Sequence, residues 1–279
     1  MPTHRPHIPE DIARAVRQHC GFGCAICGVM PTEIEHIEPF SEVQKHEFGN
    51  LVLLCSRCHR EVTSKRIGKR RVAHARCEPY CKRNRPSTYQ MYLEQQSGFK
   101  IGKHNVHAED DHPIVPVSLG GFEPIKFLLK PTPIFSLRIN GPDGELAISV
   151  TENTFDFRPG KFWDVKLSGT RLEIRWKRKF VLLKATVREG ILVFHALRVS
   201  ANGLTFCADK TGTVVFPGNI LLGSGNIGVS RGFPAFALGE KARSTINVNL
   251  GRATDEEAWR VAEDMSSQKI QTRFSKARR

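Results

Sequence analysis

Two Cys-x-x-Cys pairs constrain the fold of this chain more than any other feature: Cys24 with Cys27, and Cys55 with Cys58. Two such pairs, separated by about the length of a β-hairpin, are typical of a structural Zn²⁺ site with four thiolate ligands. One pair alone would be weak support. Cys20 could compete as a ligand, but the Cys-x-x-Cys geometry favours Cys24 and Cys27. The sequence therefore predicts a zinc-stapled unit near the N-terminus.

Four polar residues lie between and just after these pairs: Glu35, His36, Asn50 and His59. Over residues 5–66 the chain resembles the HNH endonuclease family, in the cysteine-flanked branch that includes the McrA-type restriction nucleases. His36 is similar to the first histidine of that family, Asn50 to its asparagine and His59 to its last histidine. Eight residues separate Asn50 from His59, as in the family. The resemblance leaves most of the chain without an assignment.

The resemblance implies a ββα unit, and the local sequence agrees. Residues 33–37 alternate polar and apolar side chains as a half-buried strand does, and the apolar run 51–54 suits a second strand after a turn at 48–50. Residues 57–65 contain neither proline nor glycine and are expected to form the helix. A short leading helix is expected over 8–17. The first strand and the later helix would then present the two histidines of the motif.

The resemblance also implies roles for these residues. His36 would be the general base that activates water, because a neutral imidazole accepts a proton near pH 7. His59, with Glu35 as second ligand, would hold one Mg²⁺, Mn²⁺ or other divalent cation at the scissile phosphate. Asn50 would either pin the loop that carries His36 or serve as the second ligand instead. Many relatives carry aspartate at the position of Glu35, so the reach of this carboxylate differs.

A zinc-ribbon module that binds nucleic acid without catalysis is the competing interpretation. Retention of His36, Asn50 and His59 together favours an active nuclease, since a decayed site is expected to lose at least one of them. By family analogy the setting is restriction or defence against foreign DNA, with a low-specificity nicking nuclease in repair or recombination as the rival. A double-strand break needs two active sites or two visits, which would suit a homodimer.

The positive charge of the chain, +14 in total, is concentrated just after the motif. Residues 51–90 carry eleven lysines and arginines against two acidic residues. Such a cluster beside a proposed phosphodiester-cutting site is the electrostatic signature of a DNA partner. The alternative is a solvated basic segment that aids solubility. The residues expected to contact phosphates are Arg57, Arg60, Lys65, Arg66, Lys69, Arg70 and Arg71.

Other potential ligands are weaker. His74, Cys77 and Cys81 have spacing that could begin a second metal site, but no fourth ligand is evident. His46 falls in the turn between the motif strands and is expected to be a surface residue, with a secondary contact to DNA as the lesser alternative.

The fold class expected for the whole chain is α+β. An HNH domain with a basic extension is expected at 1–88, a linker at 89–130, and a C-terminal helix with a basic tail at 251–279. Between them, residues 131–250 carry alternating segments every eight to twelve residues, which predict a mainly antiparallel sandwich or barrel for target recognition or sensing. Thr254 and Glu257 have the spacing of a helix capping box.

The eight cysteines, without a signal-peptide pattern at the start of the sequence, favour a reducing compartment and metal binding. No apolar run approaches the ~20 residues of a membrane span. The sequence therefore predicts a soluble cytoplasmic protein with no membrane partner.

Overall fold

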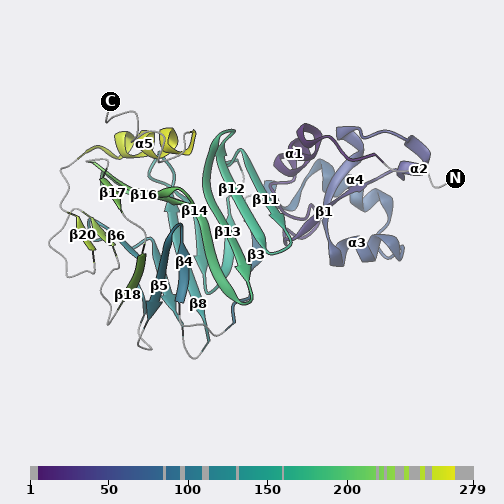
Figure 1. Cartoon of the computed structure of the whole chain (residues 1–279). Coiled ribbons are helices and arrows are strands. Elements are labelled where there is room, and N and C mark those ends of the chain that lie inside the picture. The colour runs from purple at the N-terminus through teal and green to yellow at the C-terminus, as the bar shows by residue number, and fades with distance from the viewer. Residues whose placement is uncertain are drawn as a thin grey trace. The chain divides into compact units, whose positions relative to one another are not determined.

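The computed structural model describes residues 6–83, 86–94, 98–108, 113–129, 132–158, 160–217, 220–222, 225–229, 236–238, 246–248 and 253–267. The chain forms two compact units. Unit 1 comprises Met1–Gln90 and Phe155–Ser168, and unit 2 comprises Met91–Thr154 and Gly169–Arg279. The long helices of the N-terminal region belong to unit 1, and most strands belong to unit 2 (Figure 1). The predicted α+β class is confirmed.

Unit 1 contains the ββα arrangement expected around the cysteine pairs. Its elements are α1 (Glu10–His19), β1 (Thr32–His36), α2 (Phe40–Val43), the 3₁₀ turn η1 (Phe48–Asn50), β2 (Leu51–Cys55), α3 (Ser56–Thr63), α4 (Lys69–Cys77), the 3₁₀ turn η2 (Tyr80–Lys82), β3 (Ser87–Gln90), β10 (Thr154–Phe157) and β11 (Asp164–Ser168). β1 and β2 pair antiparallel, with Thr32 opposite Cys55 and His36 opposite Leu51. α3 follows β2 without an intervening loop.

Strand β2 is the centre of the unit 1 core. All five of its residues are buried, whereas β1 is only half-buried. Helix α1 packs on this core through Val16 and the partly buried Ile12, which its helical spacing places on one face. Pro9 precedes the helix, acidic residues occupy its first turn and basic residues its last, so the charges complement the helix dipole.

The segment 155–168 belongs to unit 1, although the sequence pattern placed it in the β-rich domain. Polar contacts explain the difference. Asp164 Oδ1 accepts a hydrogen bond from Arg17 Nε at 2.9 Å, and its Oδ2 accepts one from Arg17 Nη2 at 2.8 Å, with both side chains largely buried. The Arg14 guanidinium lies 4.5 Å from the ring centre of Trp163. Contacts between residues so distant in sequence leave no local signal.

Unit 2 consists mainly of strands. They are β4 (Gly98–Ile101), β5 (His104–Ala108), β6 (Val117–Leu119), β7 (Ile125–Leu128), β8 (Ile134–Asn140), β9 (Leu146–Thr151), β12 (Arg171–Lys177), β13 (Phe180–Arg188), β14 (Ile191–Ala201), β15 (Leu204–Asp209), β16 (Gly212–Phe216), β17 (Ile220–Leu222), β18 (Gly225–Val229), β19 (Phe236–Leu238) and β20 (Ile246–Val248). Four of them, β4 to β7, lie in the stretch expected to be a linker. That expectation was wrong, because these strands pair mostly with distant partners such as β14, β18 and β19.

Two sheets pack on each other in unit 2. One contains β7, β8 and β9, and the other contains β12 to β17 with β4, β5 and β18. Phenylalanines from both sheets meet between them: the rings of Phe99 and Phe127 stack with centroids 4.0 Å apart, and Phe194 lies edge-on to Phe135 at 5.7 Å. All four are almost fully buried. This part of unit 2 is therefore layered like a sandwich.

Helix α5 (Asp255–Ser267) covers part of the larger sheet. Its capping box is present: Glu257 N–H donates to Thr254 Oγ1 at 3.2 Å, and Thr254 N–H donates to Glu257 Oε2 at 2.9 Å. Trp259 is buried edge-on against Trp176 and Phe180. The basic tail expected after this helix, from residue 268 onward, lies outside the described residues. Over the described part of the chain, no helix has the length and apolar character to cross a membrane.

Candidate functional site

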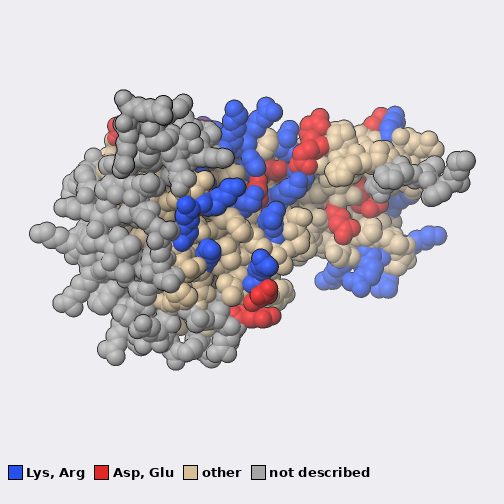
Figure 2. Space-filling model, viewed as in Figure 1, with Lys and Arg blue, Asp and Glu red and all other residues tan. Residues whose placement is uncertain are grey.

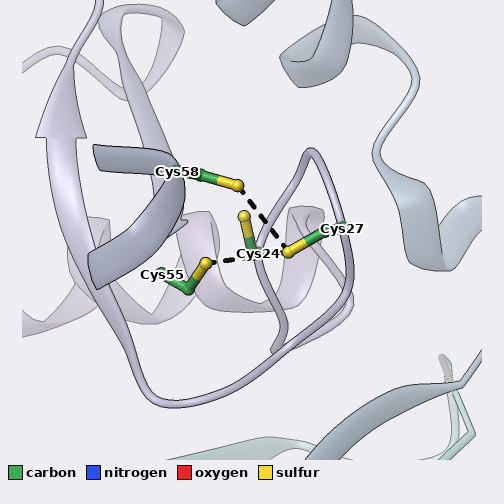
Figure 3. A group of neighbouring side chains, drawn as sticks. All are labelled: Cys24, Cys27, Cys55 and Cys58. Carbon is green, nitrogen blue, oxygen red and sulfur yellow. Dashed lines mark hydrogen bonds between the residues drawn. The ribbon is translucent and has the colours of Figure 1, made fainter. Parts of the chain in front are cut away.

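The four cysteines of the two pairs meet in unit 1. Cys24 and Cys27 lie in the turn after α1, Cys55 ends β2, and Cys58 lies in the first turn of α3. Their sulfur atoms lie within 4.8 Å of one another and point toward a common centre (Figure 3). The chain supports this turn locally, because Gly28, at a φ of +80°, donates its N–H to Cys24 O at 2.7 Å.

The sulfur spacing fits a tetrahedral zinc ion. Cys27 Sγ lies 3.6 Å from Cys55 Sγ and 3.7 Å from Cys58 Sγ. Four thiolates, each about 2.3 Å from one zinc, would be about 3.8 Å apart. Both distances are far longer than a disulfide bond, and all eight cysteines of the chain are free. The four thiols would therefore hold one structural zinc.

Three of the four thiols influence one another's pKa strongly. A hydrogen bond from the Cys27 thiol lowers the pKa of Cys24 to about 5 and raises the pKa of Cys27. Burial raises the pKa of Cys58 to about 12. A second thiolate is unfavourable beside Cys24, because like charges repel at this spacing. A bound zinc would supply the positive charge that lets all four ionise.

The remaining cysteine and histidine candidates do not extend this site. Cys20 is buried beside the cluster, and burial raises its pKa to about 11, but it is not part of the four-sulfur group. The possible second site at His74, Cys77 and Cys81 is not assembled: Cys77 is exposed, Cys81 is buried, and the three form no metal-binding group among the described residues.

Glu35 and His59 lie side by side. His59, the residue after the last zinc-site cysteine, is in α3, and Glu35 is in β1. His59 Nε2 lies 3.1 Å from Glu35 Oε2, with 37% and 31% of the two side chains exposed. Two ligands at right angles around a cation, each about 2.1 Å from it, would be about 3.0 Å apart. The pair therefore fits two positions of an octahedral divalent cation, and its exposure leaves room for water and phosphate.

His36 follows Glu35 on β1 but has a different environment. Only 6% of its surface is exposed. Its Nε2 lies 3.2 Å from Nδ1 of His46, and its ring is edge-on to Phe40 at 5.5 Å. His46 was expected to be a surface residue, but it is half-buried, because the loop after α2 returns it to His36.

Asn50 joins the two strands of the motif at their connected ends. Its Oδ1 accepts a hydrogen bond from Glu38 N–H at 2.8 Å, and its Nδ2 donates to Glu38 O at 2.9 Å. Its backbone carbonyl accepts from Ile37 N–H at 2.9 Å. Both ends of the Asn50 amide are thus engaged with the segment that follows His36.

The seven predicted phosphate contacts are all exposed. Arg57 and Arg60 lie on α3, Lys65 and Arg66 lie in the loop after it, and the other three, Lys69, Arg70 and Arg71, form the first turn of α4. Lys and Arg side chains gather over the part of unit 1 that carries α3 (Figure 2). Lys69 Nζ also contacts Glu38 Oε2 at 2.8 Å, and Arg66 Nη1 lies 3.4 Å from Glu61 Oε1.

Comparison with known proteins gives one finding. A family model described as HNH endonuclease matches residues 18–65, which include both cysteine pairs and the residues Glu35, His36, Asn50 and His59. No curated protein and no solved structure matches the chain. The HNH endonucleases are nucleases that act on DNA and use divalent metals, so the match supports a nuclease in general terms. Residues 18–65 of this chain are therefore similar to the HNH endonucleases.

Proposed function

We propose that this protein is a metal-dependent endonuclease that hydrolyses phosphodiester bonds in DNA. The observation that carries the proposal is the contact between Glu35 and His59, 3.1 Å apart and partly exposed, with His36 as the next residue on β1. A carboxylate and an imidazole at this spacing are suitable ligands for one divalent cation. A structural role alone would not require an exposed carboxylate and histidine at this place in the ββα unit.

Each residue of the motif has a distinct part in the proposed reaction. His36 accepts a proton from the attacking water. Glu35 and His59 would hold Mg²⁺ or Mn²⁺, which when bound supplies positive charge at the phosphate and at the departing 3′ oxygen. Asn50 pins the segment after His36 through its two hydrogen bonds to the backbone of Glu38. The structural zinc would fix α3, and thereby the position of His59.

The first turn of α4 supports DNA as the substrate. Lys69, Arg70 and Arg71 occupy this turn, which contains no acidic residue, and Gly68 provides no side-chain cap. Cations at a helix N-terminus oppose the helix dipole, so the arrangement is unfavourable within the protein itself. The same cations suit an incoming phosphate. We assign the other four basic residues, on α3 and in its following loop, to the same non-specific contact.

The wider setting follows from the resemblance. We place the protein with the McrA-like branch, in restriction or defence, and assign unit 2 to target recognition or regulation. The flanking of the motif by two cysteine pairs supports the branch. A homodimer would provide the two active sites that a double-strand break needs. A low-specificity nicking nuclease in repair or recombination is the second candidate. It is favoured because the described part of unit 1 contains no recognisable base-reading element beside the basic residues.

The test is cleavage of supercoiled plasmid by the zinc-loaded full chain with Mg²⁺, Mn²⁺ or EDTA, beside two variants. We expect metal-dependent nicking or linearisation that is lost in His36→Ala and retained in the control His74→Ala, because His74 is an exposed histidine outside the motif. Relaxed circles alone would favour the nicking enzyme. A third outcome is that the wild-type protein binds DNA but cleaves neither unmodified nor modified plasmid under any condition. That result would support a zinc-dependent nucleic-acid-binding protein without catalysis.

A further inference from the structure

His46 makes three specific contacts that a surface histidine does not need. Its Nε2 lies 2.8 Å from Pro6 O, and its Nδ1 lies 3.2 Å from His36 Nε2. Its ring stacks on Phe40, with centroids 4.9 Å apart and an angle of 25° between the planes. His46 is half-buried, and its contact with His36 is partly shielded from water, whereas its contact with Pro6 O is exposed. A backbone carbonyl, an aromatic ring and the neighbouring histidine thus hold one imidazole.

These partners define the tautomers of both rings. A carbonyl oxygen only accepts hydrogen bonds, so His46 Nε2 must carry the proton that it donates to Pro6 O. In a neutral imidazole the other nitrogen is then an acceptor, which makes His46 Nδ1 the acceptor of a proton carried by His36 Nε2. In the neutral ring of His36, Nδ1 is consequently the unprotonated nitrogen.

We propose that His46 is a positioning residue for His36: it fixes the orientation and tautomer of the His36 imidazole, so that Nδ1 is the nitrogen that takes the proton of the attacking water. The inference rests on the proposed nuclease function and deepens it. The water loses one proton to Nδ1, and the resulting hydroxide attacks phosphorus. The bond from phosphorus to the 3′ oxygen breaks, and that oxygen leaves and takes up a proton from water. The proton on Nε2 remains hydrogen-bonded to His46 throughout. A second histidine thus controls the general base without touching the substrate.

A packing role for His46 makes a different prediction, and two variants separate the roles. His46→Phe retains an aromatic ring for stacking on Phe40 but removes the acceptor that faces His36. His46→Asn loses the ring but keeps an acceptor oxygen close to the position of Nδ1. A packing role would be preserved by phenylalanine and lost with asparagine. The positioning role is preserved by asparagine and lost with phenylalanine.

The experiment measures cleavage kinetics and the tautomer of His36 in the zinc-loaded full chain. We expect His46→Phe to lower kcat roughly 10- to 100-fold with little change in KM, because an imidazole that loses its hydrogen-bonding partner is no longer held in its orientation. We expect His46→Asn to retain most of the wild-type kcat. Long-range ¹H–¹⁵N correlation spectra of ¹⁵N-histidine protein, with the His36 signals assigned from His36→Gln, should show a protonated Nε2 in the wild type and in His46→Asn.

Two results would overturn the inference: wild-type His36 protonated on Nδ1, or a His46→Phe variant with wild-type kcat. Failure of the proposed function is distinguishable from both. If no variant and no substrate gives cleavage, the nuclease assignment fails, and the spectra still decide whether His46 fixes the tautomer of His36.

Discussion

Replacement of Asn50 separates two mechanisms that predict opposite results. If Asn50 pins the loop after His36, it acts through the two hydrogen bonds to the backbone of Glu38, at 2.8 and 2.9 Å. If it were a metal ligand, it would act through its side-chain oxygen alone. Alanine removes both features. Aspartate keeps an oxygen that can bind a cation but has no N–H for Glu38 O.

The magnitude follows from these two bonds. Each hydrogen bond contributes about 1 kcal/mol to the free energy of unfolding, and the backbone groups of exposed Glu38 can turn to water when Asn50 is lost. Asn50→Ala should therefore lower the free energy of unfolding by about 1–2 kcal/mol. Asn50→Asp should cost at least as much, because an anionic oxygen would replace the donor that now lies 2.9 Å from Glu38 O.

The assay is urea unfolding at saturating zinc, with Mn²⁺ binding measured by titration calorimetry on the same proteins. Pinning predicts that both variants lose stability, with Mn²⁺ affinity changed only a few-fold. Two results together would refute the pinning role. Asn50→Ala would unfold like the wild type but bind Mn²⁺ at least tenfold more weakly, and Asn50→Asp would bind Mn²⁺ with normal affinity. Asn153→Ala in unit 2 is the matched control, because Asn153 makes the same two kinds of hydrogen bond, to Phe135 N–H and Pro133 O. The loss of these bonds should not affect Mn²⁺ binding.

Four further outcomes are expected. Removal of zinc by a chelator, or Cys58→Ser, should unfold unit 1 and leave the β-sheet circular dichroism of unit 2, because structural zinc contributes about 10–16 kcal/mol in small zinc domains. Glu35→Gln should weaken Mg²⁺ binding at least tenfold in calorimetry while leaving zinc content unchanged. Arg70→Gln should reduce the slope of log K against log salt for duplex binding by about 0.9 for one lost phosphate contact. Thr254→Ala should lower unfolding stability by about 1 kcal/mol through loss of its bond to Glu257, measured by urea unfolding.

Strands that carry their signal locally could be predicted from the sequence. Among the alternating segments expected over residues 131–250 are those that form β13 and β14. Such alternation arises because one face of the strand is buried. The pattern is the same whichever strand is its partner. Strand β5 could not be found this way, because its sequence is polar and its parallel partner β18 follows more than a hundred residues later. Parallel pairing of short polar strands is a tertiary property.

The same distinction applies to the site. The cysteines were predictable, because four thiolates around one zinc require two close pairs, and the pairs are visible as spacing. The contact of His46 with His36 depends on a turn. Gln44 ends α2 in the left-handed conformation, with a φ of 52°, and redirects the chain that carries His46. Glutamine is not a typical residue for that conformation, so the sequence carried no signal of the reversal.

The order of residues at the start of α3 connects the structural metal to the proposed chemistry. Cys55 ends β2, Cys58 lies one helical turn later, and His59 follows at once. When both thiolates bind one zinc, the first turn of α3 is held at both ends, and the direction of His59 is fixed with it. Glu35 reaches His59 from β1, whose register with β2 places Glu35 opposite Val52. Zinc bound by the four thiols, together with the strand pairing, would therefore bring the two proposed ligands together independently of any catalytic cation. It follows that cleavage should track zinc occupancy even in excess Mg²⁺, because added Mg²⁺ cannot restore an α3 that has lost its anchor.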